Sequence, residues 1–113
     1  MLNDASKNAM LTAWKPLYPY IGLLNDSDVE LSGGTPAYAR KAAAWTVPTT
    51  GSIAIGGPLT FDIPAGAVVS KVAYFSAITG GTQGGVFDSG PINETFAGQG
   101  NYVLDSGDIQ LNN

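Results

Sequence analysis

Apolar and polar residues alternate in two arms of segment 59–77, LTFDIPAGAVVSKVAYFSA. A period of two is typical of β-strands, because successive side chains of a strand point to opposite faces. Pro64 cannot donate to a ladder and Gly66 tolerates a positive φ, so the two strands are separated by a bend. This bend is either a long hairpin loop or a crossover between two sheets. The side chains expected to share one core here are Phe61, Ile63, Val72, Tyr74 and Trp45.

The first 16 residues predict a helical arm. Asn3 or Asp4 can cap the helix, and Met10 and Trp14, four residues apart, lie on one face. Lys15-Pro16 is expected to end the helix. Such a short helix is marginal on its own, so we expect it to dock through Met10 and Trp14.

The rest of the chain is a series of short apolar segments separated by turn residues. Segment 17–24 predicts an edge strand or a strand start, because it contains Pro19. Segment 37–47 predicts a strand with Ala43, Trp45 and Val47 on one face, although residues 38–44 are also compatible with a helix. Further strands are expected at 52–55, 84–88, 92–96, 102–104 and 109–111. Turn signals this frequent predict a single domain over 1–113, an all-β sandwich or jelly roll of about seven to nine strands with one short N-terminal helix.

Composition narrows the possible functions. The 113 residues include 15 Gly and 7 Pro, only 12 % are charged, and the net charge is −4. Five Lys and Arg residues form no basic patch, so we expect no nucleic-acid ligand. The chain contains neither Cys nor His, which removes thiolate zinc sites, the usual general base and the usual activator of a serine nucleophile. We therefore expect no enzyme activity, no cofactor and no membrane span.

Acidic residues offer the few candidate chemical sites. Asp26, Asp28 and Glu30 alternate in a polar loop at 25–36 and could offer oxygens to Ca²⁺, but the loop lacks the glycine and final carboxylate of an EF-hand. Asp105 and Asp108 form a weaker version of the same pattern. We interpret the first group as a solvated acidic loop and the second as turn residues.

A carboxylate pair is the other possible reactive site. Asp88 and Glu94 could be proposed as the two acids of a glycosidase. Sequence spacing does not place them across a cleft, so the pair predicts no activity by itself.

Aromatic residues near the loops are the best candidates for partner binding, because exposed aromatic side chains make good interface anchors. The candidate partner-binding residues are Trp14, Tyr18, Tyr20, Tyr38 and Arg40. Arg40 and Lys41 are the only adjacent basic pair. They either bind an acidic neighbouring subunit or form a solvated strand edge, and the edge is the favoured interpretation.

Four motifs in order give the chain a family resemblance. They are GGTPAYARK (33–41), FDIPAG (61–66), FSAITGGT (75–82) and ETFAGQG (94–100), preceded by the opening NDASKN (3–8). Together they resemble small structural proteins, commonly labelled tail-fibre proteins, of tailed phages that infect actinobacteria. The resemblance covers most of the chain and departs from the family at 18–29. It implies a virion component.

These observations leave two functional hypotheses. The first is a non-enzymatic structural protein, made in the host cytoplasm and located in the virion, that decorates or cements the capsid or tail. Its partners would be other copies of itself and the major virion proteins, so we expect a homo-oligomer or a lattice-bound subunit. The second is a tail-tip module that binds a host-surface receptor or glycan.

Overall fold

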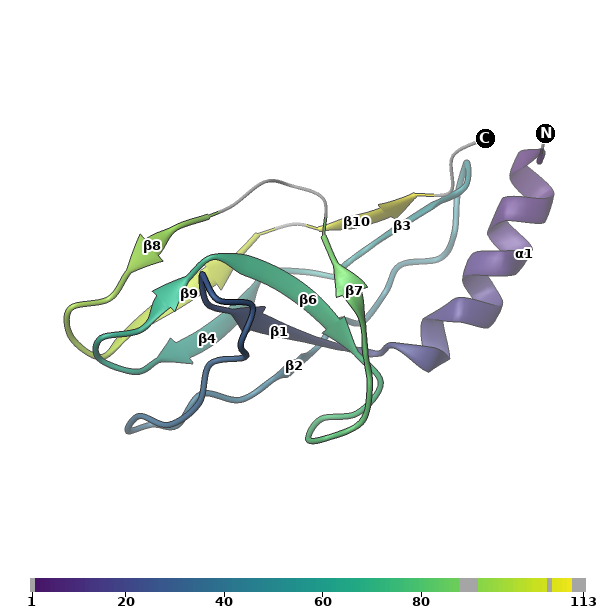
Figure 1. The fold of residues 1–113 in the computed structure, drawn as a ribbon. Coiled ribbons are helices and arrows are strands. Elements are labelled where there is room, and N and C mark those ends of the chain that lie inside the picture. Colours follow the sequence, from purple (N-terminus) through teal and green to yellow (C-terminus); the bar gives the residue numbers. More distant parts are fainter. Residues whose placement is uncertain (1, 88–91, 106, 111–113) are drawn as a thin grey trace.

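The computed structural model describes residues 2–87, 92–105 and 107–110 (Figure 1). Over these residues the chain consists mostly of β-strands in antiparallel sheets, with one short α-helix at the N-terminus. The molecule is elongated, with principal extents of 47 × 24 × 23 Å. Its radius of gyration of 14.7 Å exceeds the roughly 13 Å expected for a compact chain of this length.

The helical elements are α1 (Asp4–Trp14) and the short 3-10 helix η1 (Lys15–Leu17). The strands are β1 (Tyr20–Leu24), β2 (Lys41–Ala42), β3 (Ser52–Ala54), β4 (Leu59–Ile63), β5 (Val68–Val69), β6 (Lys71–Phe75), β7 (Gln83–Val86), β8 (Glu94–Thr95), β9 (Gly100–Leu104) and β10 (Asp108–Gln110). Ten strands over the described residues exceed the predicted seven to nine, because several are only two residues long.

The two alternating arms of segment 59–77 are strands β4 and β6, as predicted, and the connection between them is a crossover. β6 lies in a four-stranded sheet of order β2-β1-β6-β7, whereas β4 pairs with β9. The other ladders are β10-β3 and β5-β8. The first arm and the second arm therefore belong to different sheets.

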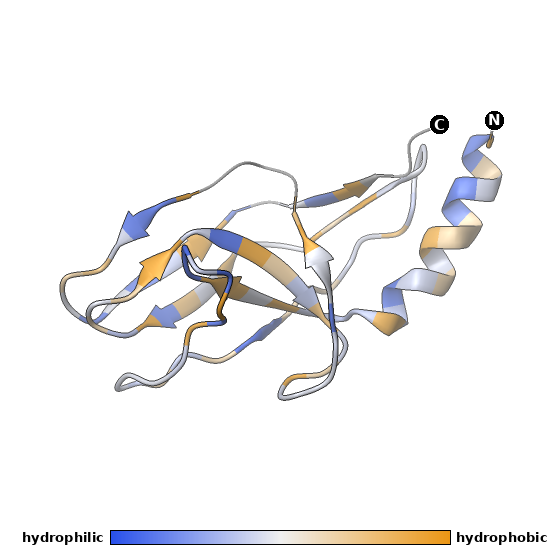
Figure 2. Cartoon of the chain, viewed as in Figure 1, coloured by the Kyte–Doolittle hydropathy of each residue, from blue (hydrophilic) through white to orange (hydrophobic). Residues whose placement is uncertain are grey.

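The main core lies between these ladders. Ile21 and Leu23 of β1 cluster with Phe61 and Ile63 of β4, and all four side chains are fully buried. Figure 2 shows the apolar residues along β1. The prediction of a shared core is confirmed: Phe61, Ile63 and Val72 are buried, and Trp45 and Tyr74 pack against them while partly exposed. A smaller cluster on the other face of the sheet contains Leu24, Ala73 and Phe75.

Helix α1 forms as predicted and docks through Trp14 as expected, but with Leu11 in place of Met10. The Asn3 side chain caps it by accepting a hydrogen bond of 2.9 Å from the Ser6 amide. Leu11 is buried, whereas Met10 is 51 % exposed, so the predicted docking through Met10 is wrong. Trp14 does dock, against Trp45 and Tyr74, and Leu11, three residues before it, takes the place expected for Met10.

Segment 37–47 departs from the predicted strand. Only Lys41–Ala42 is a strand, and Val47 is 77 % exposed instead of sharing a face with Ala43 and Trp45. Ala44 has φ +50°, in the left-handed region, so the two-residue alternation stops there.

Segment 17–24 is also placed differently from the expected edge. Its strand, β1, is central, with β2 on one side and β6 on the other. Pro19 stands just before the first strand residue, as the alternative prediction of a strand start requires, and its carbonyl accepts a hydrogen bond of 2.8 Å from the Ala43 amide.

The C-terminal half follows the predicted strand positions with shorter or shifted bounds. Segment 84–88 overlaps β7, segment 92–96 contains β8, segment 102–104 lies within β9, and segment 109–111 overlaps β10. Asp88 and Leu111 lie outside the described residues.

Candidate partner-binding surface

Five aromatic rings join the N-terminal helix to the central sheet. Trp14, at the end of α1, lies with its ring centroid 5.4 Å from that of Tyr18, 5.5 Å from Trp45 and 5.2 Å from Tyr74. Phe87 extends the cluster, 5.7 Å from Tyr74. These tilted and edge-to-face contacts are favourable aromatic geometries, and they hold the helical arm against the sheet.

The sequence around this aromatic cluster accommodates the rings closely. The indole N–H of Trp45 donates to the Tyr18 carbonyl oxygen over 2.8 Å. A Cβ added at Gly84 would lie 2.6 Å from the Tyr18 ring, and one at Gly85 would collide with the Tyr74 hydroxyl. The Gly84-Gly85 pair in β7 therefore makes room for two tyrosines.

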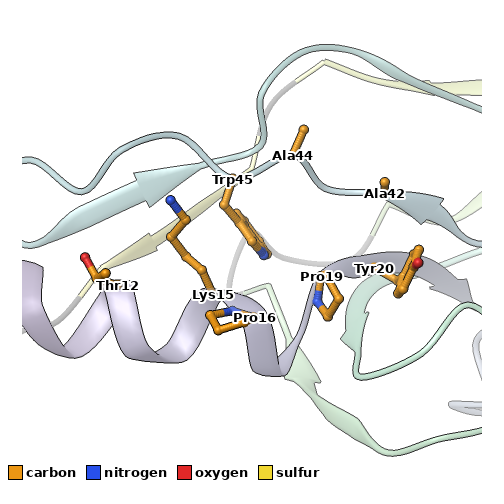
Figure 3. Close-up of a pocket in the computed structure, with 8 residues that line it drawn as sticks. All are labelled: Thr12, Lys15, Pro16, Pro19, Tyr20, Ala42, Ala44 and Trp45. Atoms are coloured by element: carbon orange, nitrogen blue, oxygen red, sulfur yellow. The ribbon is translucent and has the colours of Figure 1, made fainter.

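An open apolar groove of about 420 Å³ lies between the end of the helical arm and β2 (Figure 3). Trp45 and Tyr20 contribute aromatic surface, Pro16 and Pro19 contribute rigid apolar surface, and Lys15 contributes the charged group. The remaining lining residues are Thr12, Ala42 and Ala44. The groove can accept a flat apolar or sugar-like group, but it has few polar atoms to orient one.

A separate site, which is polar, is built around Glu30. Arg40 donates to both carboxylate oxygens of Glu30, from Nε and from Nη2, each over 2.8 Å. Its Nη1 donates to the carbonyl oxygens of Ala77 and Gly80, at 2.8 and 2.7 Å, and its guanidinium lies 3.8 Å over the ring of Phe75. The Arg40 side chain is 10 % exposed, so Arg40 is not the solvated edge residue that we favoured.

Tyr38 completes this network beside Leu23 of β1. Its hydroxyl accepts a hydrogen bond of 2.8 Å from the Leu23 amide and donates one of 2.8 Å to Glu30. Its ring stacks on Phe61 of the main core. Burial, together with the adjacent Glu30 carboxylate, raises the pKa of Tyr38 above the ordinary tyrosine value. We call Glu30, Tyr38 and Arg40 the Glu30 network.

Glycine at position 22 makes the Glu30 network possible. A Cβ there would lie 2.6 Å from the Phe75 ring, 2.7 Å from the Tyr38 hydroxyl and 2.9 Å from Glu30 Oε2. All three groups approach the backbone of β1 through the space that a larger residue would fill.

The three acidic residues proposed for Ca²⁺ have separate environments. Glu30 pairs with Arg40, Asp28 pairs with Lys71, and Asp26 is exposed. Asn25 fixes the turn, because its side-chain oxygen accepts hydrogen bonds from the Ser27 and Val29 amides. Within the described residues, no group of three or more acidic side chains is placed to hold a metal ion.

The other acidic candidates lie elsewhere. Asp105 follows β9, Asp108 opens β10 and both are exposed. Glu94 is exposed in β8, and its proposed glycosidase partner, Asp88, lies outside the described residues.

Apolar side chains are exposed on several elements. The large ones are Leu2, Met10, Leu17, Val29, Val47, Ile78, Val86 and Val103. Leu17 and Val29, each 58 % exposed, belong to the helical arm and to the turn after β1. Leu17 directly precedes Tyr18, one of the predicted partner-binding residues.

The five predicted partner-binding residues fall into distinct settings. Trp14 and Tyr18 belong to the aromatic cluster, Tyr20 lines the groove, and Tyr38 and Arg40 belong to the Glu30 network. Sequence reasoning missed the polar centre, Glu30, which we assigned to a solvated acidic loop.

No family model, curated protein or solved structure matches the chain. Within the described residues, neither helix combines the length and apolar character that crossing a membrane requires.

Proposed function

We propose that this chain is a non-enzymatic structural component of a phage virion that decorates or cements the capsid or tail through protein–protein contacts. The observation that carries the proposal is the ordered set of four motifs that resemble small tail-fibre-labelled proteins. Exposed apolar side chains on a domain with few charges support it, because such surfaces suit burial against other protein.

The attachment surface in this proposal is the helical arm together with the turn after β1. Leu17 and Val29 are exposed there without belonging to the main core. Two of the chain's five basic residues, Arg40 and Lys71, are already in internal ion pairs. We therefore expect attachment through apolar and backbone contacts more than through charge.

The finer architecture belongs to the same proposal. We propose that the β2-β1-β6-β7 sheet and the β4-β9 ladder are the two layers of a β-sandwich or jelly roll. The supporting observation is that Ile21 from the first and Phe61 from the second belong to one buried cluster.

The direct test is the chain's presence and copy number in purified virions. Mass spectrometry of gradient-purified particles should detect it in a fixed ratio to the major capsid or tail protein, and labelled antibody should locate it by electron microscopy. Its absence from particles would refute the proposal.

The attachment surface has a separate test. Leu17→Asp should loosen the chain from particles, whereas Val103→Asp, which also adds a charge at an exposed apolar position, should not. Raising salt from about 0.1 to 1 M shortens the screening length from roughly 10 to 3 Å. We expect the parent chain to stay attached through this change, and release would show that charge holds it.

The alternative function is a tail-tip module that binds a receptor or glycan. The groove with Tyr20 and Trp45 favours it, because aromatic rings stack on sugars in such sites. Glycan-array binding that is lost in Trp45→Ala but retained in Val103→Ala would support this alternative.

A further inference from the structure

Strand β7 has an open side. It is the last strand in the order β2-β1-β6-β7, and β6 is its only strand partner within the described residues. Phe87 N–H donates to the Val72 carbonyl oxygen over 2.9 Å, so the backbone polar groups of Phe87 point toward β6. Residues that face each other in an antiparallel pair alternate between hydrogen-bonded and non-hydrogen-bonded positions. Val86 is the residue before Phe87 and lies opposite Ala73, so its N–H and C=O point away from β6.

Nothing in the sequence of β7 blocks pairing at this side. Edge strands are usually protected by Lys, other charges, Pro or a cover. Segment 80–87, GGTQGGVF, has no charged residue and no proline. Gly84 and Gly85 leave the backbone without side chains of its own, and Val86 is 43 % exposed. The glycines cannot be exchanged for larger residues, because Tyr18 and Tyr74 occupy the space.

Four other strand edges differ in charge or in cover. Lys41 lies in β2, Glu94 in β8 and Asp108 in β10. Beside β3, Thr46 N–H donates to the Ala54 carbonyl oxygen over 2.9 Å and covers that side.

Strand β9 is uncharged, but its surroundings are acidic. Glu94 and Asp105 act on Tyr102, whose pKa is raised by burial and then by these two carboxylates. Pairing β9 with a second β9 would therefore bring like charges together.

We propose that β7 pairs antiparallel with β7 of a second copy of this chain, about a two-fold axis, to form a continuous eight-stranded sheet. An identical strand suits this edge because a two-fold contact brings the same patch of both copies together. In a chain of net charge −4, an uncharged patch lets two copies meet without facing like charges. The inference rests on the proposed oligomeric role and names the surface that carries it.

The oligomeric state of three full-length chains provides the test. By analytical ultracentrifugation, the parent chain should dimerise. Val86→Pro should be monomeric while keeping its circular dichroism spectrum and melting temperature, because the N–H that it removes does not serve β6. Val86→Ala keeps that N–H and should still dimerise. If the Val86→Pro chain does not fold, amide hydrogen exchange of the parent chain decides whether β7 pairs.

Amide hydrogen exchange of the parent chain gives that second, independent measurement. The Val86 amide should exchange at least tenfold more slowly at about 1 mM than at about 10 μM chain, because only the dimer protects it. The Phe87 amide, bonded to Val72 within the chain, should be protected at both concentrations and is the internal control.

The outcomes separate this inference from the proposed function. A chain that stays monomeric at about 1 mM, with a Val86 amide that exchanges equally fast at both concentrations, overturns the β7 pairing even if the chain is found in virions. Protection of Val86 only on addition of another virion protein also overturns it, since the partner is then not a second copy. Absence from virions, with a dimer in solution, overturns the proposed function and leaves the pairing intact.

Discussion

Replacing Tyr38 by Phe removes one oxygen atom from the centre of the Glu30 network. The ring that stacks on Phe61, with centroids 6.3 Å apart, keeps its place. The Leu23 amide loses the acceptor that it reaches at 2.8 Å, and Glu30 loses one donor. The change therefore tests the hydroxyl group alone.

The magnitude follows from which groups are left unpaired. A buried donor without an acceptor costs about 1–3 kcal/mol, whereas Glu30 keeps both of its bonds from Arg40. We expect a loss of roughly 2 kcal/mol in the free energy of unfolding. With an unfolding entropy of about 2.1 cal/mol/K per residue over 113 residues, this lowers the melting temperature by roughly 8 °C.

Urea titration at pH 7, read by circular dichroism, measures this loss, and Tyr102→Phe is the matched control. Tyr102 is also partly buried, but its hydroxyl has no hydrogen bond within the described residues, so we expect a change under about 0.5 kcal/mol. An equal, small loss of stability for both variants would refute our interpretation that the Tyr38 hydroxyl is the acceptor that the buried Leu23 amide requires.

Alkaline pH probes the same hydroxyl. The pKa of Tyr38 is raised in the folded chain, so the folded state holds this proton when an unfolded tyrosine, with a pKa near 10, has begun to lose it. The stabilisation is fully present below about pH 10 and is lost as pH rises above it, by at most about 1.4 kcal/mol per pH unit. Tyr38→Phe should lose less stability than the parent between about pH 10 and 11.5. Equal slopes for the two chains would contradict the raised pKa.

Three further changes test the core, a turn and the acidic loop. Phe61→Ala should cost about 3–5 kcal/mol in urea titration, because the side chain is fully buried; a loss below about 1 kcal/mol would place it outside the core. Thr50 and Gly51, at φ +48° and +76°, form a two-residue hairpin turn that favours Asn-Gly, so Thr50→Asn should stabilise by roughly 0.5–1 kcal/mol, and a lower melting temperature would contradict the turn assignment. EDTA should leave the melting temperature unchanged, because Asp28 and Glu30 have separate cationic partners; a fall that Ca²⁺ reverses would restore the calcium hypothesis.

The strands with regular alternation could be predicted from the sequence. In β4 the two-residue period coincides with burial, since Phe61 and Ile63 are fully buried. Strand β6 is buried on both faces instead, with Val72 in the main core and Ala73 and Phe75 in the smaller cluster. The period does not say which strand pairs with which, because pairing is set by contacts between distant segments. This is why the hairpin and the crossover stayed equal alternatives until the structure separated β4 from β6.

Segment 37–47 shows where local pattern fails. Its alternation continues through Val47 in the sequence, yet Ala44 adopts a positive φ that the pattern does not encode. The neighbouring backbone explains this conformation in part: the Gly56 amide donates to the Ala43 carbonyl oxygen over 2.9 Å. A contact between residues thirteen positions apart thus overrides the local preference for a strand.

The Glu30 network illustrates the same limit for charged residues. Residues 26, 28 and 30 share a sequence pattern, but Glu30 forms an ion pair with Arg40 and Asp28 forms one with Lys71. These two acids therefore contact different parts of the chain. A chain with few charges places two of its five basic residues in these internal pairs. Fewer basic groups then remain for partners, while the backbone of β7 and the exposed apolar side chains stay available. This distribution is the physical reason to seek the partner contact at the β7 edge and the helical arm instead of at the Arg40-Lys41 pair.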